Sequence, residues 1–569
     1  MQRKNRTASE KIPLGEANTI SKCFRRKEIV LNKILKLTAL TLVFSLCACN
    51  KIEYPEPSDN ETGTDTHETQ IITTPQEETA DTDLNPIDEP ELVVQEFSEK
   101  WQMEGNCSAD THTALDGYEG DGYIQLASEQ SVTITVSVPT AQHYKLTLYV
   151  CSAACKIAVL TGNSAEESSA QSLTEIGAFY IEKSVSFKPF VLDGLYLDAG
   201  ENEITFNGLS GTAYIDRLTL ENGSRISDDY YIVPAAPIDK NASTQTVRLI
   251  SYLHDIYGKR TLTGQYVTVN TNAELYAIYN ETGRFPAIRA SDLSVYAERF
   301  PGATDENNDL ELAAEWAEKG GIVSYSWTWY APSETKPHYL SASTDFDFKK
   351  AYTTVDCSEA SLDTIKSLWG DGTISEETYL LAKDLDEMAA SLEKLEALGV
   401  TVLFRPLMEA GGGWYWWGED AEAYKWLWRF MVKRYNNFLG LHNIVWVWNG
   451  ESADFYPGDE YVDIISQDVY GGLLGSASFR FSYSNFYQSG GKASALSEAS
   501  SVPDPDAMTR DNALWQWFCV WRGDYIIDEN GAFSDAYTTA ERLSYAYNHQ
   551  LFLTLDELPN LKTYSSANN

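Results

Sequence analysis

Two glutamates in the C-terminal half of the chain stand directly after apolar runs. Glu409 follows residues 400–408, VTVLFRPLM, and Glu498 follows residues 492–497, KASALS. A protonated carboxyl can assist a leaving oxygen while an ionised carboxyl attacks the adjoining carbon, provided that their surroundings push their pKa values apart. Two carboxyls about 5–5.5 Å apart would cleave a glycosidic bond with retention of configuration. The alternative for each glutamate is a solvated charge in a loop.

The residues that follow Glu409 favour a ligand cleft over a solvated loop. Gly411, Gly412 and Gly413 let the backbone pass close to a bound molecule, and the aromatic sequence WYWW follows at 414–417. The chain holds 15 Trp and 34 Tyr, and flat aromatic rings stack on the C–H faces of sugars. Core packing also accounts for many tryptophans in a large domain. We therefore expect Trp446 and Trp448 in the core and Trp414 in the cleft.

The elements that must position the two glutamates alternate between strands and helices from about Val247 onward. One helix, ending at Gly399, is predicted by apolar residues at spacings of three and four: Leu381, Leu385, Met388, Leu392, Leu395 and Leu398. The predicted strands are 262–266, 286–290, 322–327, 400–407, 444–448, 462–469, 493–496 and 514–521. This pattern predicts an α/β fold, a (β/α)8 TIM barrel over residues 240–566. Because such barrels carry their chemistry at the C-terminal strand ends, Glu409 and Glu498, after the fourth and seventh strands, should face one pocket.

A separate all-β domain is predicted over residues 94–224. Side chains alternate with period two in residues 131–138, SVTITVSV, and again in residues 144–150, YKLTLYV. Short alternating strands with turn signals between them are typical of a β-sandwich, or jelly roll. Cys151 and Cys155 fall in this domain, where an oxidising setting would allow a disulfide between them.

The N-terminal segment carries a targeting signal. Basic residues from Arg25 to Lys36 precede an apolar run, 37–48, that is too short to span a bilayer. Residues 46–49, LCAC, resemble a bacterial lipobox, which predicts a signal peptide over residues 1–49 and lipidation at Cys49. Residues 50–93 are rich in Thr, Pro and acids, and predict a disordered linker. We therefore expect an extracellular, cell-surface lipoprotein anchored to a bacterial membrane through Cys49.

The segment around Glu409 resembles the acid/base segment of glycoside hydrolase family 26, chiefly β-mannanases. FRPLME at 404–409 and WYWWG at 414–418 carry the resemblance, supported in chain order by LTGQ at 262–265, PAIR at 286–289, IVWVWN at 444–449, YPGD at 456–459 and LDELP at 555–559. The resemblance implies that Glu409 is the acid/base and Glu498 the nucleophile of a double displacement.

The same resemblance implies a set of substrate-binding residues. Trp414 resembles the aromatic platform on the leaving-group side, and Tyr470 the tyrosine that hydrogen-bonds the nucleophile. Trp521 resembles the tryptophan that floors the subsite where cleavage occurs. Arg405 is expected to keep the nucleophile ionised, since a nearby cation favours the charged form of a carboxyl. The set is completed by Asp468, Trp329 and Trp417.

Two positions depart from the family pattern. The family usually has histidine immediately before the acid/base, where this chain has Met408, and histidine between two tryptophans after the third strand, where this chain has Thr328. Both histidines would lie beside the reacting sugar. Losing them could lower activity, shift the sugar preference or mark a descendant that only binds, but the retained Glu409 and Glu498 favour an enzyme.

The all-β domain resembles carbohydrate-binding module family 35. The resemblance lies in the turn GYEGDGY at 117–123, the run LDAGENEI at 197–204 and the closing strand YIDR at 214–217. It implies a structural calcium between an acidic residue of the first strand and one of the last, where Glu104 and Asp216 stand, and calcium prefers such oxygen donors. The alternative is two ordinary surface acids.

These features together predict an endo-acting, retaining β-1,4-mannanase that hydrolyses mannan, galactomannan or glucomannan at the cell surface. Catalysis is expected to need no cofactor, and the chain is expected to be a monomer. The net charge of −40 argues against a nucleic acid partner, which would need a basic face. The alternatives are a β-glucanase or β-1,3-xylanase with the same carboxylates, and a surface glycan-binding lipoprotein without catalysis.

Overall fold

The computed structural model describes residues 115, 117–119, 123–163, 173–303, 306–470, 477–480 and 491–566. It also describes the backbone of three short strands, at residues 93–96, 102–104 and 108–110. The predicted signal peptide with Cys49, and the predicted linker up to residue 92, lie outside the described residues and stay predictions. Among the helices that the structure describes, none has the length and apolar character needed to cross a membrane.

Two antiparallel sheets form an all-β region in the N-terminal part. One sheet has the order β3-β4-β11-β6-β9 with β1 beside β11, and the other has the order β2-β5-β10-β7-β8. The strands are β1 (Val93–Glu96), β2 (Gln102–Glu104), β3 (Ser108–Asp110), β4 (Tyr123–Ala127), β5 (Ser131–Val138), β6 (Gln142–Ser152), β7 (Cys155–Asn163), β8 (Thr174–Ile181), β9 (Lys188–Leu197), β10 (Gly200–Ser210) and β11 (Thr212–Asn222). The strand predicted at 131–138 is confirmed as β5, whose apolar side chains are all buried because alternate residues face the core.

The two cysteines of this all-β region are described by the structure. Cys151 and Cys155 are free thiols, so the disulfide that an oxidising setting would allow is not formed in the structure. Each thiol has a partner of its own, because Cys151 Sγ donates to the carbonyl of Ser184 and Cys155 Sγ accepts from the hydroxyl of Ser152.

The predicted calcium ligands are only partly described. Asp216 is fully buried in β11, where its Oδ1 accepts from the backbone N–H of Glu119 at 3.1 Å and its Oδ2 from Arg217 at 2.5 Å. Both oxygens therefore already have N–H donors, an arrangement that does not favour a cation. The side chain of Glu104 lies outside the described residues, so the calcium itself stays a prediction.

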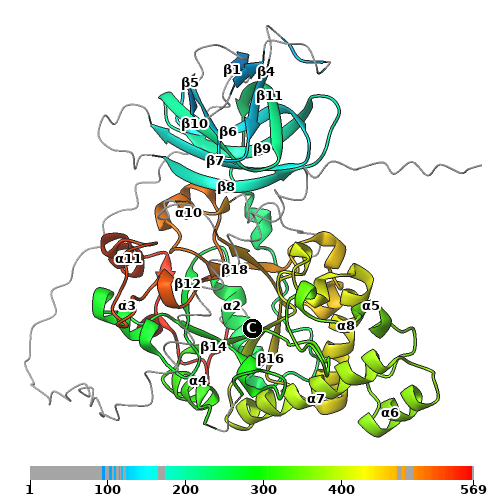
Figure 1. Ribbon diagram of the computed structural model, residues 1–569. Helices are drawn as coiled ribbons and strands as arrows, with labels where there is room; N and C mark the ends of the chain where they lie inside the picture. The colour runs from blue at the N-terminus through cyan, green and yellow to red at the C-terminus, as the bar shows by residue number, and fades with distance from the viewer. Residues whose placement is uncertain are drawn as a thin grey trace, which may run out of the picture. The chain divides into compact units, whose positions relative to one another are not determined.

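Eight parallel strands, β12 to β19, close into a barrel in the C-terminal part (Figure 1). The strands pair in chain order, β12 also pairs with β19 to close the ring, and the short β20 lies beside β12. The strands are β12 (Thr261–Tyr266), β13 (Ile288–Asp292), β14 (Ile322–Trp327), β15 (Val402–Pro406), β16 (Ile444–Trp448), β17 (Ile464–Val469), β18 (Ala493–Ala499), β19 (Trp517–Val520) and β20 (Phe552–Leu553). The predicted (β/α)8 barrel is confirmed, with Glu409 after the fourth strand and Glu498 in the seventh.

Helices surround the barrel (Figure 1). They are α2 (Thr244–Ile256), α3 (Ala273–Thr282), α4 (Asp309–Glu318), α5 (Phe348–Ala351), α6 (Leu362–Gly370), α7 (Glu376–Ala397), α8 (Ala421–Lys433), α10 (Pro505–Asp511) and α11 (Ala540–Tyr547). The predicted leucine-rich helix is α7, and its apolar stripe is buried up to Leu395. Leu398 differs, because the helix ends at Ala397 and Leu398 is 61% exposed before Gly399, which turns the chain at φ 72°.

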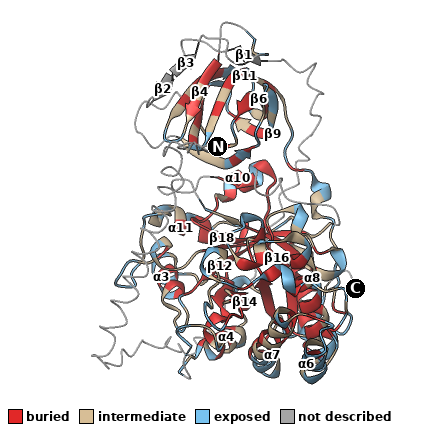
Figure 2. Ribbon diagram, turned by 45° about the vertical axis from the view of Figure 1, so that its right-hand side comes forward, coloured by how far each residue is buried: buried red, intermediate tan, exposed pale blue. Residues whose placement is uncertain are grey.

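The barrel strands are buried on both faces (Figure 2), as expected for parallel strands enclosed by helices. Polar and charged residues nevertheless occur near their C-terminal ends, at Asp292, Arg405, Asp468 and Glu498. Buried charges are stable only when they are paired or hydrogen-bonded. The C-terminal end of the barrel is therefore where the functional site is expected.

Candidate active site

Glu498 lies near the end of β18 and is 5% exposed. Each of its carboxylate oxygens has a donor, because Arg405 Nη2 donates to Oε1 and the hydroxyl of Tyr470 donates to Oε2 at 2.5 Å. Both oxygens of the Glu498 carboxyl therefore accept hydrogen bonds, one of them from a cation. Arg405 and Tyr470 thus lie against Glu498, as the sequence predicted.

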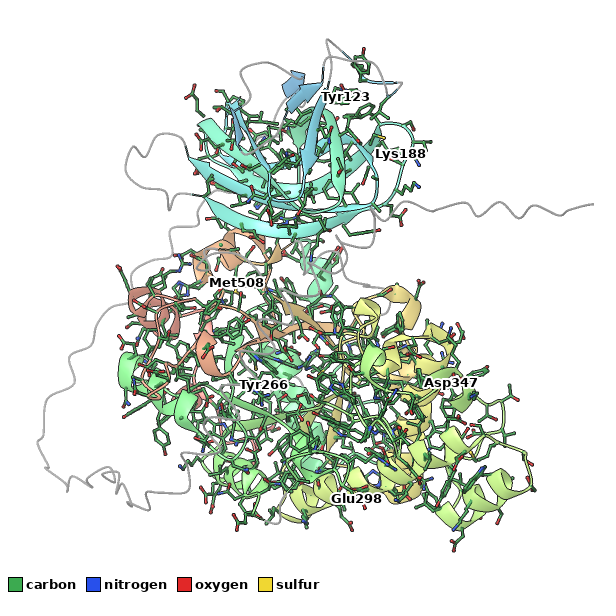
Figure 3. The ribbon with its side chains drawn as sticks, viewed as in Figure 1. Tyr123, Lys188, Tyr266, Glu298, Asp347 and Met508 are labelled. Atoms are coloured by element: carbon green, nitrogen blue, oxygen red, sulfur yellow. The ribbon has the colours of Figure 1, made fainter. Side chains whose placement is uncertain are left out.

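Arg405, on β15, connects several strands at the C-terminal end of the barrel. Its guanidinium is 1% exposed and donates to Asp468 at 2.7 Å, to the side-chain oxygen of Asn449 at 3.1 Å and to the hydroxyl of Tyr266 at 2.8 Å. Tyr266 ends β12 and lies within the barrel (Figure 3). With Glu498 as the fourth partner, one side chain ties residues of β12, β15, β17 and β18, and the residue that follows β16, into one network.

The backbone of Glu409 is held in an uncommon conformation. Glu409 has a left-handed φ of 53°, and its N–H donates to the carbonyl oxygen of Asn449 at 2.6 Å and to its side-chain oxygen at 3.1 Å. Two residues later, the N–H of Gly411 donates to the carbonyl of Gly450 at 2.8 Å. A non-glycine residue keeps such a conformation only where its surroundings fix it. The loop after β15 is therefore anchored to the end of β16, which fixes the position of the Glu409 carboxyl.

The carboxyl of Glu409 differs from that of Glu498 in its environment. Burial raises the pKa of Glu409 to about 8, and the negative charges of Glu498 and Glu451 add to this effect. Its nearest described donor is neutral, since Trp414 Nε1 donates to Oε2 at 3.0 Å. The pair thus consists of a carboxyl whose pKa is raised, Glu409, and a carboxyl that accepts a hydrogen bond from a cation, Glu498, the division of roles that acid-assisted displacement needs.

The two carboxyls lie close together. One oxygen from each of Glu409, Asp468 and Glu498 lies within 4.8 Å of an oxygen of the other two. Retaining glycosidases hold their carboxyls about 5–5.5 Å apart, whereas inverting ones leave room for a water between carboxyls about 6.5–9.5 Å apart. The observed approach is that of a nucleophile and an acid acting on the same bond.

The same three oxygens are close enough to share a metal ion. Arg405 already donates to both Asp468 and Glu498, however, and its positive charge would repel a cation placed among them. The donor set fits a carboxylate–guanidinium network better than a metal centre.

Three aromatic residues of the predicted site offer a surface to a ligand. Trp414 and Tyr470 are each 40% exposed. Trp521 is partly exposed just after β19, and its ring centroid lies 4.7 Å from that of Tyr266. Trp414 donates to Glu409, Tyr470 donates to Glu498, and Trp521 lies beside Tyr266. Their predicted contact with substrate remains a prediction.

The structure corrects the predicted roles of Trp329 and Trp417, which are only 1% and 0% exposed. Trp329 stacks on Trp327 at 4.1 Å, and its Nε1 donates to Asp384 at 3.1 Å. Trp417 Nε1 donates to the carbonyl of Met408 at 2.8 Å. Neither indole presents a face to a sugar, so both pack behind the site and support the loop that carries Glu409.

The two positions where family members usually have histidine are filled differently. The hydroxyl of Thr328 donates to Asp292 Oδ2 at 2.7 Å, and its backbone N–H approaches the same oxygen at 3.2 Å. Met408 is 4% exposed. Thr328 therefore directs its hydrogen toward the barrel wall, while the thioether of Met408 packs in the core.

Four polar residues of the site were not among the predicted site residues: Tyr266, Asp292, Asn449 and Glu451. Tyr266 and Asp292 are the last residues of β12 and β13, and Asn449 directly follows β16. A search for polar residues at the ends of the predicted strands would have identified these three. The position of Glu451 depends on a loop conformation that the sequence pattern does not indicate.

A (β/α)8 barrel with a close pair of carboxyls at the C-terminal ends of its strands is the arrangement that retaining glycoside hydrolases use. Residues 238–557 match the sequence profile of glycosyl hydrolase family 26, and the chain belongs to this family.

Similar proteins extend over most of the chain. Mannan endo-1,4-beta-mannosidase B of Piromyces sp is 29% identical over 463 residues, which are 79% of this chain and 75% of that protein. Mannan endo-1,4-beta-mannosidase of Thermothelomyces thermophilus is 30% identical over 475 residues, 78% of this chain and 87% of its own length. The crystal structure of a GH26-CBM35 beta-(1,4)-mannanase from Podospora anserina has a TM-score of 0.53 at 29% identity, and the match covers 83% of this chain and 99% of that one.

Proposed function

We propose that this chain is an endo-β-1,4-mannanase that hydrolyses mannan with retention of configuration. The observation that carries the proposal is the approach of Glu409 and Glu498 oxygens to within 4.8 Å in opposite environments. The names of the similar proteins, all mannan endo-1,4-β-mannosidases or mannanases, support the substrate and the endo mode of attack.

The proposed reaction has two steps. In the first, Glu498 attacks the anomeric carbon while Glu409 gives its proton to the glycosidic oxygen, so that the leaving chain departs and a glycosyl ester forms on Glu498. In the second, Glu409, now a carboxylate, takes a proton from water as the water attacks the same carbon and frees Glu498. The raised pKa of Glu409, to about 8, keeps the proton available for the first step at neutral pH.

The proposal is tested by the products that the purified protein releases from mannan, glucomannan, mixed-linkage glucan and β-1,3-xylan. Manno-oligosaccharides of several lengths are expected from the first two. Products only from glucan or xylan would keep the mechanism and replace the substrate, assigning the Met408 and Thr328 changes to sugar preference.

A catalytic variant separates hydrolysis from binding. Glu498→Ala should abolish product release while the variant still binds mannan with nearly unchanged affinity. As a matched control, Glu419→Gln alters an exposed acid and should release the same products as the unchanged protein. Binding without products from any glycan in the unchanged protein would support a glycan-capturing lipoprotein and contradict an enzyme.

We also propose that the N-terminal sandwich is a family 35-like carbohydrate-binding module. The match to the GH26-CBM35 mannanase, whose name includes such a module, supports this because it covers 83% of this chain. If the module contributes to binding, removal of residues 94–224 should weaken the retardation of the Glu498→Ala variant in gels containing mannan. Equal retardation with and without these residues would contradict a binding role for the sandwich.

We propose finally that Cys49 is lipidated and anchors the protein to a bacterial cell surface. The proposal is supported by the order of the segments, in which basic residues from Arg25 to Lys36 precede the apolar run 37–48, which leads into LCAC at 46–49. The full chain should fractionate with membranes and Cys49→Ala should be released, whereas equal fractionation of both would contradict lipidation.

A further inference from the structure

We propose that Glu451 is a positioning residue for catalysis, whose negative charge holds the proton on Glu409 until the glycosidic oxygen takes it. The inference rests on the proposed role of Glu409 as acid/base. Glu451 does not replace either catalytic carboxyl, and it acts through Glu409.

The backbone places Glu451 beside the acid/base. Glu451 follows the end of β16 by three residues and has a left-handed φ of 54°, close to the φ of 53° at Glu409. The two loops are joined by the hydrogen bonds from Glu409 to Asn449 and from Gly411 to Gly450. A Cβ added at Gly411 would lie 3.0 Å from the carbonyl oxygen of Gly450, so the loops meet without room between them. Two glutamates in the same uncommon conformation therefore lie on adjoining loops.

The side chain of Glu451 is directed to the carboxylate network. Its Oε1 accepts a hydrogen bond from the backbone N–H of Asp468 at 3.2 Å. This anchor turns the carboxyl toward β17, whose Asp468 binds Arg405. Glu451 is thus joined, through the backbone of Asp468, to the group of Glu409, Asp468 and Glu498, two of which accept from Arg405.

The charges around these carboxyls act in known directions. On Glu409, the charges of Glu498 and then Glu451 raise the pKa, and Arg405 lowers it. On Glu451, Glu498 raises the pKa, whereas Arg405 and, with the smallest effect, Lys156 lower it. Asp468, on β17, interacts electrostatically with both glutamates. One cation among four acids leaves an excess of negative charge, which favours proton retention by the carboxyl without a cationic partner.

The ionisation of Glu451 gives it its effect on Glu409. Burial raises the pKa of Glu451 to about 7 and that of Glu409 to about 8. Once Glu451 has lost its proton, its negative charge opposes the ionisation of Glu409. At lower pH Glu451 is neutral and exerts no such force. Glu451 thus extends the active, protonated form of Glu409 to higher pH without changing the reaction at low pH.

The first experiment measures kcat/KM for a mannan oligosaccharide from pH 5 to 9.5 in the unchanged protein and in Glu451→Gln. Glutamine keeps an oxygen for the Asp468 N–H and removes only the charge. The basic limb, which is the fall of kcat/KM on the alkaline side of the pH profile, should lie about 0.5–1 pH unit lower in Glu451→Gln than in the unchanged protein. At pH 5.5 the two kcat/KM values should agree within about twofold, because Glu451 is neutral there. Glu419→Gln, a change of an exposed acid, should leave the limb in place.

Two results would overturn the inference. A basic limb that stays at its original pH in Glu451→Gln would show that the charge does not act on Glu409. An equal loss of kcat/KM at every pH would assign Glu451 to structure or to substrate binding.

A second measurement keeps this test separate from the proposed function. Glu409→Gln is assayed on a dinitrophenyl mannobioside, whose leaving group needs no proton. If Glu409 is the acid/base, formation of the glycosyl-enzyme should persist and lose its basic limb. A limb that persists in this variant would contradict the role of Glu409 itself. Loss of the limb here, together with an unmoved limb in Glu451→Gln, would overturn only the role of Glu451.

Discussion

The hydroxyl of Tyr470 lies 2.5 Å from Oε2 of Glu498, on the carboxylate oxygen that Arg405 does not hold. Glu498 is 5% exposed and Tyr470 is 40% exposed, so the tyrosine connects a buried carboxylate to the solvent-exposed surface. In the proposed mechanism the negative charge of Glu498 disappears when the ester forms and returns when it breaks. Tyr470 is then positioned to orient the attacking carboxylate and to stabilise it as it leaves.

Replacing Tyr470 by Phe removes this one hydrogen bond to a charged group. Such bonds contribute about 1.5–3 kcal/mol, so kcat for mannan should fall by about 10- to 100-fold with little change in KM. Tyr525→Phe is the matched control, because Tyr525 lies against the Tyr470 ring at 5.7 Å and should retain kcat within about twofold. Equal kcat values for Tyr470→Phe and the unchanged protein would contradict the role of this hydroxyl.

Trp414 and Trp417 should respond to alanine substitution in opposite ways. Trp414 is 40% exposed, so Trp414→Ala should leave the melting temperature nearly unchanged and raise KM for long manno-oligosaccharides by about tenfold. Trp417 is 0% exposed, and Trp417→Ala should lower the free energy of unfolding by about 3–5 kcal/mol. The free energy of unfolding is measured by denaturant unfolding, and KM by steady-state kinetics, for both variants. A destabilised Trp414→Ala with normal KM would reverse the assignment.

Arg405→Lys should be severe although it conserves charge. An ammonium cannot donate to Asp468, Tyr266 and Glu498 in the geometry of the guanidinium, so some of these buried acceptors would be left without a hydrogen-bond donor. We expect a loss of about 3–5 kcal/mol in the free energy of unfolding and loss of activity. Arg248→Lys, on α2 where Arg248 contacts the carbonyl of Lys562, is the control and should unfold normally. Normal stability of Arg405→Lys would show that the network tolerates a point charge.

The raised pKa of Glu409 has a consequence for stability. Its folded pKa is about 8 and its unfolded value is 4.5, so the folded protein binds the proton more tightly. Its contribution to stability is complete below pH 4.5 and is lost as pH rises toward 8. Glu409→Gln cannot ionise, so its melting temperature should match that of the unchanged protein at pH 5 and exceed it at pH 9. Equal differences at both pH values would contradict the raised pKa.

The sequence predicted the parts of the site that depend on strand periodicity. Glu409 and Glu498 fall after apolar runs that became the fourth and seventh barrel strands, and a closed barrel necessarily brings such strand ends together. Burial within the aromatic run 414–417 was not predictable in the same way. After the chain turns at Gly413, which has φ 69°, Trp414 is exposed, Tyr415 is half-buried, and both Trp416 and Trp417 are buried. Trp417 was therefore placed with Trp414, although only Trp414 is exposed.

Contacts between loops were equally beyond the sequence. The role inferred for Glu451 depends on left-handed backbone at two non-glycine residues, a conformation that residue type does not predict. The hydroxyl of Thr328 found a partner in Asp292, which lies on the neighbouring strand 36 residues away in the chain. Both features follow from the packing of barrel loops and not from local preference.

The configuration of the first product tests the central claim most directly. The enzyme is mixed with manno-oligosaccharide at high concentration, and the anomeric protons of the newly formed reducing ends are followed by NMR before mutarotation. Oxygens of Glu409 and Glu498 within 4.8 Å leave no place for a water between the carboxyls, so two displacements are required and the β-anomer should appear first. Initial appearance of the α-anomer would mean a single displacement by water, and would contradict Glu498 as the nucleophile.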